Sequence, residues 1–389
     1  MMTTRQLANR LFMQMTILLV LYAAATLLAA VKFLPVDPLA VSLPYHQIAG
    51  ARNVLLDLAL WTGLFAGGLT LLSETAGSSR SALLTWGYRG WTLLLALSVF
   101  AALLGLLEGR YLLELPPVLD IVLIVLTVVL LTGTIAVART ASGRAWWIGM
   151  VLALVCVAAS LIPATTPTQD RVLRVIAVGV RYHIAYVSAG AALAVALLSK
   201  LRPRSSLALP AGLAVAGVLP AISPLSAVGV GTTSMLLSLV VAAAYVFFAV
   251  IALRGARAPG WMVLGLAMIA AGGVLGAIQA APQIGNYVSG TGLSELMIFL
   301  MALGVIMLAW SASPPDSSAA LAWVAAGTLV TGLAALLAGV VQVYLERMLT
   351  LGFLDTQTAL TPLFVVWIAG LAVLAVGLGW AALRSLRTG

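Results

Sequence analysis

The sequence consists almost entirely of apolar runs that are long enough to cross a lipid bilayer as helices. A transmembrane helix needs about 20 consecutive apolar residues. Hydrophobic residues make up 63% of the 389 and charged residues 8%, which excludes an ordinary soluble domain. We predict an all-α polytopic membrane bundle of about twelve transmembrane helices, forming one integral membrane domain over residues 1–389. The expected spans are residues 11–32, 48–72, 89–108, 118–138, 146–163, 173–199, 206–222, 233–253, 260–280, 293–311, 319–343 and 360–383.

The basic residues predict the orientation of the chain in the membrane. Cytoplasmic loops of membrane proteins carry an excess of Lys and Arg. With the N-terminus inside, thirteen of the 20 basic residues lie in cytoplasmic loops and termini, and five lie on the opposite side. We therefore expect a multi-pass protein of a bacterial-type inner (plasma) membrane with both termini in the cytoplasm.

Several other classes of chemistry are disfavoured by the sequence. The net charge of +9 would suggest nucleic acid in a soluble protein, but here the basic residues lie in short loops between spans, so no nucleic-acid partner is expected. A single cysteine, Cys156, excludes an intramolecular disulfide and a cysteine-based metal site. The glycine-rich run at residues 229–234, GVGTTS, lies between two expected spans and lacks the βαβ setting of a nucleotide-binding fold.

Polar and ionisable residues inside the spans mark the candidate site, because such residues are expensive in a membrane and normally face the bundle interior. In the second expected span, His46, Asn53 and Asp57 follow one helical face at spacings of seven and four. Arg52 lies off this face and needs a different partner. Further polar residues stand in or near the outer halves of other spans: Asp120, Arg174, Arg181, His183 and Glu295.

This predicted polar layer has two interpretations. It either cements the bundle through ion pairs, or it lines a chamber for a cofactor or a substrate. Arg181 is its deepest cation, and helical rise places Asp57 at a similar depth, roughly 12–15 Å below the outer boundary. We predict a buried ion pair between Arg181 and Asp57, with Glu295 and the shallower Asp120 as alternative partners.

One stretch of the chain resembles a known family. Residues 282–291 read PQIGNYVSGT, and nitric oxide reductases of the haem-copper oxidase superfamily carry PQINYYTHGT followed closely by HGH. The resemblance implies the subunit I fold of twelve helices, shared with the C-type oxidases, with haem ligands on helices two and ten. His46 then resembles the ligand of the low-spin haem, and His183 resembles a ligand of the second metal.

The departures from this family are as informative as the resemblance. The family holds its metals with histidines on helices two, six, seven and ten, whereas this chain has two histidines in all. The family's haem ligands of helix ten fall on Met297 and Phe299, and the seventh span has no His, Cys, Asp or Glu. Met297 is a candidate haem ligand through its thioether, but Phe299 cannot ligate iron. The resemblance therefore implies a degenerate member without a dinuclear centre.

These observations lead to one leading function and two alternatives. We expect a non-catalytic relative of haem-copper oxidase subunit I, acting as a partner or accessory subunit of a respiratory or redox membrane complex and carrying no cofactor. The first alternative is a secondary transporter with a polar site in the outer half of the bundle. The second is a one-haem redox subunit that uses His46.

Overall fold

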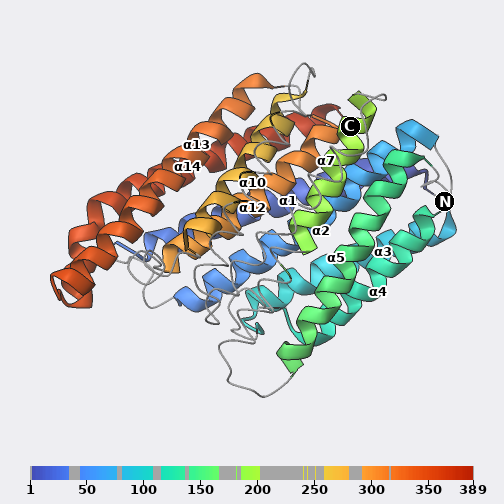
Figure 1. Ribbon diagram of the computed structural model, residues 1–389. Coiled ribbons are helices and arrows are strands. Elements are labelled where there is room, and N and C mark those ends of the chain that lie inside the picture. Colours follow the sequence, from blue (N-terminus) through green and yellow to red (C-terminus); the bar gives the residue numbers. More distant parts are fainter. Residues whose placement is uncertain are drawn as a thin grey trace.

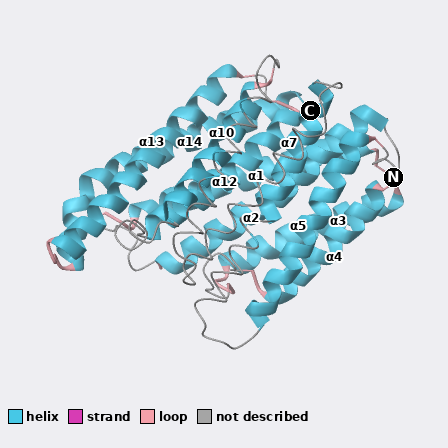
Figure 2. Cartoon of the chain, in the orientation of Figure 1, coloured by secondary structure: helices cyan, strands magenta, loops and turns pink. Residues whose placement is uncertain are grey.

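In the computed structural model the chain is a bundle of helices whose axes lie roughly parallel to one another (Figure 1). The structure describes residues 2–34, 44–76, 81–107, 115–135, 140–165, 181, 185–201, 240, 243, 250, 258–279, 291–314 and 317–388. Within these residues the elements are helices, with short turns at several helix ends (Figure 2). The all-α prediction is confirmed for this part of the chain.

The helices coincide with the apolar runs of the sequence. Nine of the twelve expected spans overlap a described helix along most of their length, and the sixth does so in its second half. The α-helices are α1 (Thr4–Val31), α2 (Tyr45–Ala76), α3 (Ala82–Leu103), α4 (Pro117–Thr134), α5 (Ala141–Thr165), α7 (Val187–Leu201), α10 (Gly260–Gln279), α12 (Thr291–Ala312), α13 (Ser318–Val343) and α14 (Phe353–Thr388); a π-helical turn, η3 (Tyr344–Met348), follows α13.

Several helices begin at residues whose side chains satisfy the first free amide groups. Thr3 accepts a hydrogen bond from the amide of Gln6, whose side chain in turn accepts from the amide of Thr3, forming a capping box. Ser81 and Ser317 cap α3 and α13 in the simpler way, through one hydroxyl acceptor each. α4 begins with Pro117 at its first helical position, where a missing amide proton costs nothing.

α2 is the central helix of the bundle. In its most apolar stretch 94% of the residues are buried, against 50% or less in the other long apolar helices. It packs against α1, α3, α5, α7 and α12, while α13 and α14 form a hairpin that lies along α1 and α12. Any polar group on α2 is therefore enclosed by protein on most sides, which makes this helix the natural place for a buried site.

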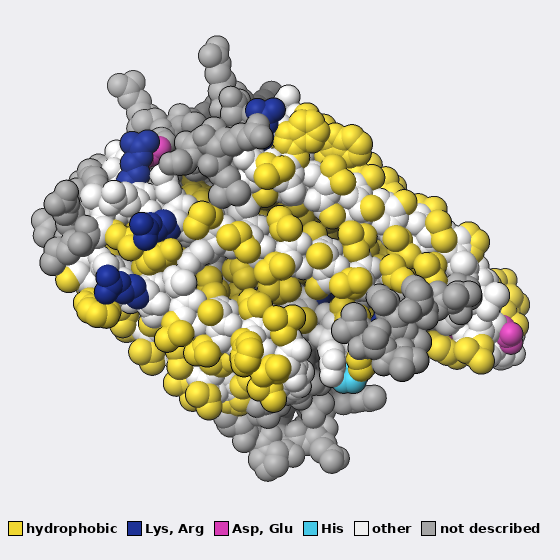
Figure 3. All heavy atoms as spheres, turned by 180° about the vertical axis from the view of Figure 1, so that it is seen from behind, with side chains coloured by type: hydrophobic (Ala, Val, Ile, Leu, Met, Phe, Trp, Pro, Cys, Tyr) yellow, Lys and Arg dark blue, Asp and Glu magenta, His cyan; other side chains and the backbone are white. Residues whose placement is uncertain are grey.

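Six of the described helices are long and apolar enough to cross a membrane: α1, α2, α4, α5, α13 with η3, and α14. The chain is thus a multi-pass helical membrane protein. The two termini lie at the same end of the bundle (Figure 1), as an even number of crossings requires. The side chains of Lys and Arg gather at that end, and a broad apolar surface covers the middle (Figure 3).

Parts of the prediction fall on residues outside the described ranges. The expected seventh span at 206–222 lies there entirely, and the eighth at 233–253 does so except for three isolated positions. The family-like stretch at 282–291 also lies outside, up to Thr291 at the start of α12. The number of twelve spans therefore stays a prediction.

The C-terminal hairpin is longer than the sequence predicts. α14 begins seven residues before the expected start at residue 360 and contains Pro362 within its first three turns. Its 36 residues extend about 54 Å, well beyond a hydrocarbon core of about 30 Å. Residues 353–359 precede the expected span, but they form the first turns of α14, so the helix is longer than the hydrocarbon core is thick. The hairpin tip carries exposed apolar residues, among them Phe353 and Leu354.

Glycines allow α13 and α14 to approach closely. A Cβ atom added at Gly327 of α13 would lie 2.6 Å from the Cα of Leu374, and one at Gly370 of α14 would lie 2.7 Å from the amide nitrogen of Thr331. Small residues at such positions are typical of helix pairs in membranes, where close backbone packing drives association.

We predict that Gly327→Ala destabilises the protein by about 1–3 kcal/mol, because the added methyl group meets backbone atoms of α14 that cannot move aside. Gly379→Ala on α14 is the matched control, since nothing lies within 4 Å of its Cβ position. Thermal unfolding in detergent should show a lower midpoint for Gly327→Ala alone. Equal midpoints for the two variants would contradict the close contact.

Candidate functional site

Arg181 lies at the centre of a buried charge cluster. Its side chain is 1% exposed and donates from Nη2 to the Oδ2 atom of Asp57 at 2.5 Å. It also binds Asp120 with two bonds, from Nη1 to Oδ2 at 3.1 Å and from Nη2 to Oδ1 at 2.8 Å. The Tyr186 hydroxyl donates to the other oxygen of Asp57. The predicted pair between Arg181 and Asp57 is confirmed, and Asp120 joins it.

The cluster connects three separate parts of the chain. Asp57 comes from the middle of α2, Asp120 from the first turn of α4, and Tyr186 from the residue just before α7. Each helix alone would carry an unpaired charge or hydroxyl into the membrane, which is unfavourable by several kcal/mol. Together they satisfy one another, so the cluster fixes α2, α4 and the start of α7 in one relative position.

The sequence-based estimate that Asp120 lies closer to the outer membrane boundary than Asp57 was wrong for a geometric reason. α2 begins twelve residues before Asp57, which is about 18 Å along the helix. α4 begins only three residues before Asp120, which is about 5 Å. The two helices therefore begin at different levels, and both carboxylates reach the same guanidinium. Counting residues from each helix start assumes a common plane, which this bundle does not have.

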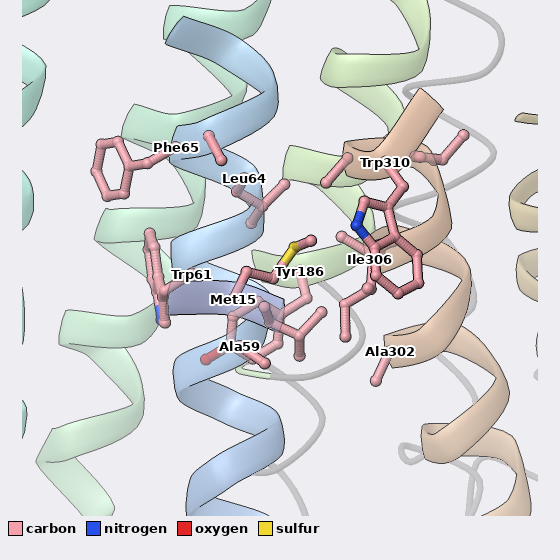
Figure 4. Close-up of a cluster of buried hydrophobic side chains, with 14 of the residues drawn as sticks. Met15, Ala59, Trp61, Leu64, Phe65, Tyr186, Ala302, Ile306 and Trp310 are labelled. Atoms are coloured by element: carbon pink, nitrogen blue, oxygen red, sulfur yellow. The ribbon is translucent and has the colours of Figure 1, made fainter. Parts of the chain in front are cut away.

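An apolar and aromatic core lies next to the charge cluster. The ring of Tyr186 packs edge-on against Trp61, at 5.8 Å between ring centroids, and Trp61 stacks on Phe65 at 6.3 Å. Figure 4 shows these rings together with Met15 from α1, and it shows Trp310 from α12 on the other side of the same group of apolar side chains. The core excludes water from this side of the charges, and a dry environment strengthens each charged hydrogen bond.

A second feature is a partly open cavity of about 460 Å³ beside α2. Its walls come from α1, α2, α12, α13 and α14. Most of the lining is apolar or aromatic, and a few polar side chains converge on it: Thr26, Arg52, Asn53, Thr331, Gln342 and Gln357. Pockets of 300–1,000 Å³ with this mixture are the usual form of small-molecule sites.

Aromatic rings form one wall of the cavity. Phe33, which follows α1, lies 5.5 Å from Tyr45, 5.5 Å from Phe364 and 5.6 Å from Trp367, measured between ring centroids. These contacts join the end of α1, the start of α2 and the body of α14. The wall is held by ring packing on three helices, so the cavity is a formed feature of the bundle.

Arg52 and its neighbour Asn53 supply the strongest polar groups of the lining. Arg52 is 8% exposed, and its Nε and Nη2 atoms both donate to Oδ1 of Asn53 at 3.3 Å. The sequence predicts Asn53 as a member of the polar layer and a separate partner for Arg52. It does not indicate that both residues line a cavity. Gln342 and Gln357, two amides in long apolar helices, were the signal that could have pointed there.

Two of the predicted metal and cofactor residues, His46 and Met297, lie in the described part of the chain. His46 is exposed at the start of α2, and Met297 is buried on α12 with 5% exposure; neither lines the cavity. Phe299 does line it. Arg174, His183 and the side chain of Glu295 lie outside the described part of the chain, so their predicted roles stay predictions.

The cavity lies between α2 and α12, the helices on which the resemblance implies haem ligands, so its fit to a haem can be tested. The described residues that line it include no histidine, methionine or cysteine, and Phe299 presents a ring that cannot ligate iron. Within the same residues, no three His, Cys, Asp or Glu side chains gather in a metal-binding group. The described lining does not fit a haem with the axial ligands of the family.

No protein-family model and no curated protein sequence matches the chain. The class is therefore defined by the fold and by the two sites on α2. The protein is a multi-pass helical membrane protein with a buried Arg–Asp–Asp cluster beside an apolar cavity.

Arg181→Ala should lower stability sharply, because it leaves two aspartates buried without their cation; breaking a buried ion pair on one side costs about 3–5 kcal/mol. Arg181→Leu combined with Asp57→Leu should recover only part of this loss, since Asp120 still lacks its partner. Adding Asp120→Leu should recover much more. Thermal unfolding of the single, double and triple variants measures this order. A double variant as stable as the triple would show that Asp120 contributes little.

Proposed function

We propose that the chain is a non-catalytic relative of haem-copper oxidase subunit I that serves as an accessory subunit of a respiratory or redox membrane complex. In this proposal it has twelve transmembrane helices, of which the described part contains six long apolar ones. The observation that carries the proposal is the Arg181 cluster. Its charges are bound to one another in the bundle interior, where members of that family carry out metal chemistry.

The chemistry of the cluster supports a structural role. A catalytic site needs groups that can bind or exchange protons with a substrate, and such groups must be reachable from a cleft. Here the Asp57 and Asp120 carboxylates contact Arg181, and the Asp57 carboxylate also contacts Tyr186, with exposures of 3% for both aspartates. Bonds of this kind stabilise a fixed helix arrangement, which is what a subunit needs if it is to present a constant surface to a partner.

The apolar surface supports residence in a complex as well as in lipid. Exposed apolar side chains cover α3, α4, α13 and α14, and the hairpin tip adds Phe353 and Leu354 beyond the expected membrane thickness. The bilayer covers such residues within its hydrocarbon core, but not those past it. Another membrane or redox subunit that contacts the hairpin tip would cover these remaining residues.

The orientation proposed for this function is testable by itself. We predict that both termini are cytoplasmic, in a bacterial-type inner membrane. The basic residues Arg5, Arg10, Arg89 and Arg144 lie in the first halves of α1, α3 and α5, and Arg384 lies in the last turns of α14, as an excess of cytoplasmic basic residues requires. Reporter fusions after Gly389 and within residues 282–291 should report opposite sides of the membrane. Signals from the same side would contradict the twelve-span arrangement.

Co-purification tests the function itself. We expect the tagged chain, extracted into nanodiscs from its own cells, to retain defined subunits of a redox complex, whereas a version with Phe353→Ser and Leu354→Ser at the hairpin tip should retain fewer of them. Leu329→Ser on the lipid-facing side of α13, which is also exposed, is the control for reduced hydrophobicity. Recovery of the chain without any stoichiometric partner would contradict the accessory-subunit proposal.

The absorbance spectrum of the same sample separates the one-haem alternative. We expect no nitric oxide or oxygen reductase activity and no stoichiometric haem. A strong Soret band that disappears in His46→Ala would show a working haem protein, and the accessory role would then be replaced by a redox one.

A further inference from the structure

We propose that the cavity between α1, α2, α12, α13 and α14 binds an uncharged long-chain amphiphile, with a hydroxyl head at Gln342 and Gln357 and its chain along the aromatic wall. Long-chain alcohols and acylglycerols share this chemistry. The site is independent of the accessory role, because it requires no partner subunit. It rests on the level of the two amides, on the bond between Gln342 and Glu346, and on the open space at Gly339.

The two amides stand at one level of the hairpin. A Cβ atom added at Gly370 of α14 would lie 2.7 Å from the amide nitrogen of Thr331, and this contact fixes the register of α13 against α14. Continued along the hairpin, the same register places Gln342 within two residues, about 3 Å, of the level of Gln357. Both side chains line the cavity, so the end of the cavity near the hairpin tip carries two amides.

This end of the cavity lies at the level of the lipid head groups. Counted from its first residue, Ser318, α13 crosses a hydrocarbon core of about 30 Å in about 20 residues and reaches the far boundary near Ala338. Gln342 lies about 6 Å beyond that boundary, whereas Thr331 lies about 10 Å inside it. The lining therefore has a polar end at the interface and continues into the hydrocarbon region, as an amphiphile lying among lipids does.

The bond between Gln342 and Glu346 selects the head group. Gln342 donates from Nε2 to Oε1 of Glu346 at 3.1 Å. A carboxylate only accepts, so this bond orients the amide, and the amide oxygen serves as an acceptor for a ligand hydroxyl. The Glu346 carboxylate would repel an anionic head at this place, and the next residue, Arg347, offsets its attraction for a cationic one. A neutral donor such as a hydroxyl meets neither obstacle.

The guanidinium in the lining does not change this choice. Arg52 donates to Oδ1 of Asn53 and takes part in a further interaction of the protein. Its interactions lie within the bundle, so the ligand needs no charge to accompany it.

The chain of the ligand is defined by the aromatic wall and by the open space opposite to close packing. Phe33, Phe364 and Trp367 form the wall, with the ring of Phe33 lying 5.5 Å and 5.6 Å from the other two. Gly339 of α13 is buried and lines the cavity, and a Cβ atom added there would meet nothing within 4 Å. In contrast, a Cβ atom added at Gly327 of the same helix would meet backbone within 3 Å. The hairpin is thus tightly packed at one level and hollow at another, and an apolar chain fits the hollow because it removes these surfaces from water.

Photolabelling of the full chain in nanodiscs tests the proposal. The probe is hexadecan-1-ol with a diazirine in its chain and an alkyne at its far end, and its methyl ether is the comparison that lacks the donor. We expect saturable labelling of peptides from the cavity lining by the alcohol, and binding of the ether that is weaker by about fivefold, the ratio that one neutral hydrogen bond supplies. Gln342→Leu should weaken binding of the alcohol by about the same factor and leave binding of the ether unchanged. Gln14→Leu is the control, since this α1 amide bonds Thr92 and is not among the described lining residues.

A substitution that fills the cavity provides the second arm. Gly339→Leu should abolish binding of both probes, because its side chain grows into the open space. Gly379→Leu is the matched control, since this α14 glycine also has nothing within 4 Å of its Cβ position and is not among the described lining residues. Thermal unfolding of each variant verifies folding. If Gly339→Leu does not fold, the comparison of alcohol with ether and the Gln342→Leu arm decide the question without it.

Analogues of the probe with a carboxylate or an ammonium head test the charge that the site accepts. We expect both to bind more weakly than the alcohol. Tighter binding of either one would overturn the proposal, as would a lack of saturable labelling, equal binding of alcohol and ether, or unchanged labelling in Gly339→Leu.

Competition identifies the source of the hydroxyl. Competition by dioleoylglycerol would assign the site to an acylglycerol, and competition by oleyl alcohol alone would assign it to a free long-chain alcohol. None of these variants alters Phe353 or Leu354, the residues of the co-purification test, so the two proposals fail separately.

Discussion

The structure depends on a single buried arginine that holds together helices from different parts of the sequence. Arg181 contacts Asp57 on α2 and Asp120 on α4, and Tyr186 closes the cluster from the start of α7. In a membrane interior apolar side chains pack nearly as well against lipid as against protein, so they do not select one arrangement of helices strongly. Buried charges do select one, because any arrangement that separates them leaves an ion without a partner. The cluster therefore supplies specificity that the apolar runs lack.

α2 carries both polar features of the bundle. Arg52 and Asn53 face the cavity, and Asp57 lies one helical turn below Asn53 and faces Arg181. Neighbouring helices enclose α2 almost completely, so most of its surface is shielded from lipid. A helix fixed on one side by an ion cluster can border a cavity on another side without collapsing into it. The charge cluster on the α4 side thus holds α2 in place, so that the cavity beside α12 and the hairpin stays open.

The sequence predicts the helices well because continuous apolar runs of sufficient length have few alternatives in a membrane. It also predicts contact of Arg181 with Asp57, since a deep arginine demands a carboxylate and helical rise places one at its level. It underestimates Asp120, because the levels at which α2 and α4 begin depend on packing between distant segments. It misses the seven residues of α14 before position 360, which include Asp355, Thr356 and Gln357 and which continue the helix beyond the expected membrane thickness.

The cavity is the feature least accessible from the sequence, and the reason is physical. A hollow arises where small residues of one helix face a neighbouring helix across a gap. The same residues pack against that neighbour when it is shifted by a fraction of a turn. Gly327 and Gly339 illustrate this: both are glycines of α13, yet one touches the backbone of α14 and the other faces open space. Only the positions of α1, α2, α12 and α14 distinguish them. The resemblance to an oxidase subunit directs attention to histidines, whereas the described cavity is lined by an arginine, amides and aromatic rings. The described lining therefore offers hydrogen-bonding side chains and ring faces at the place where the resemblance predicts metal ligands.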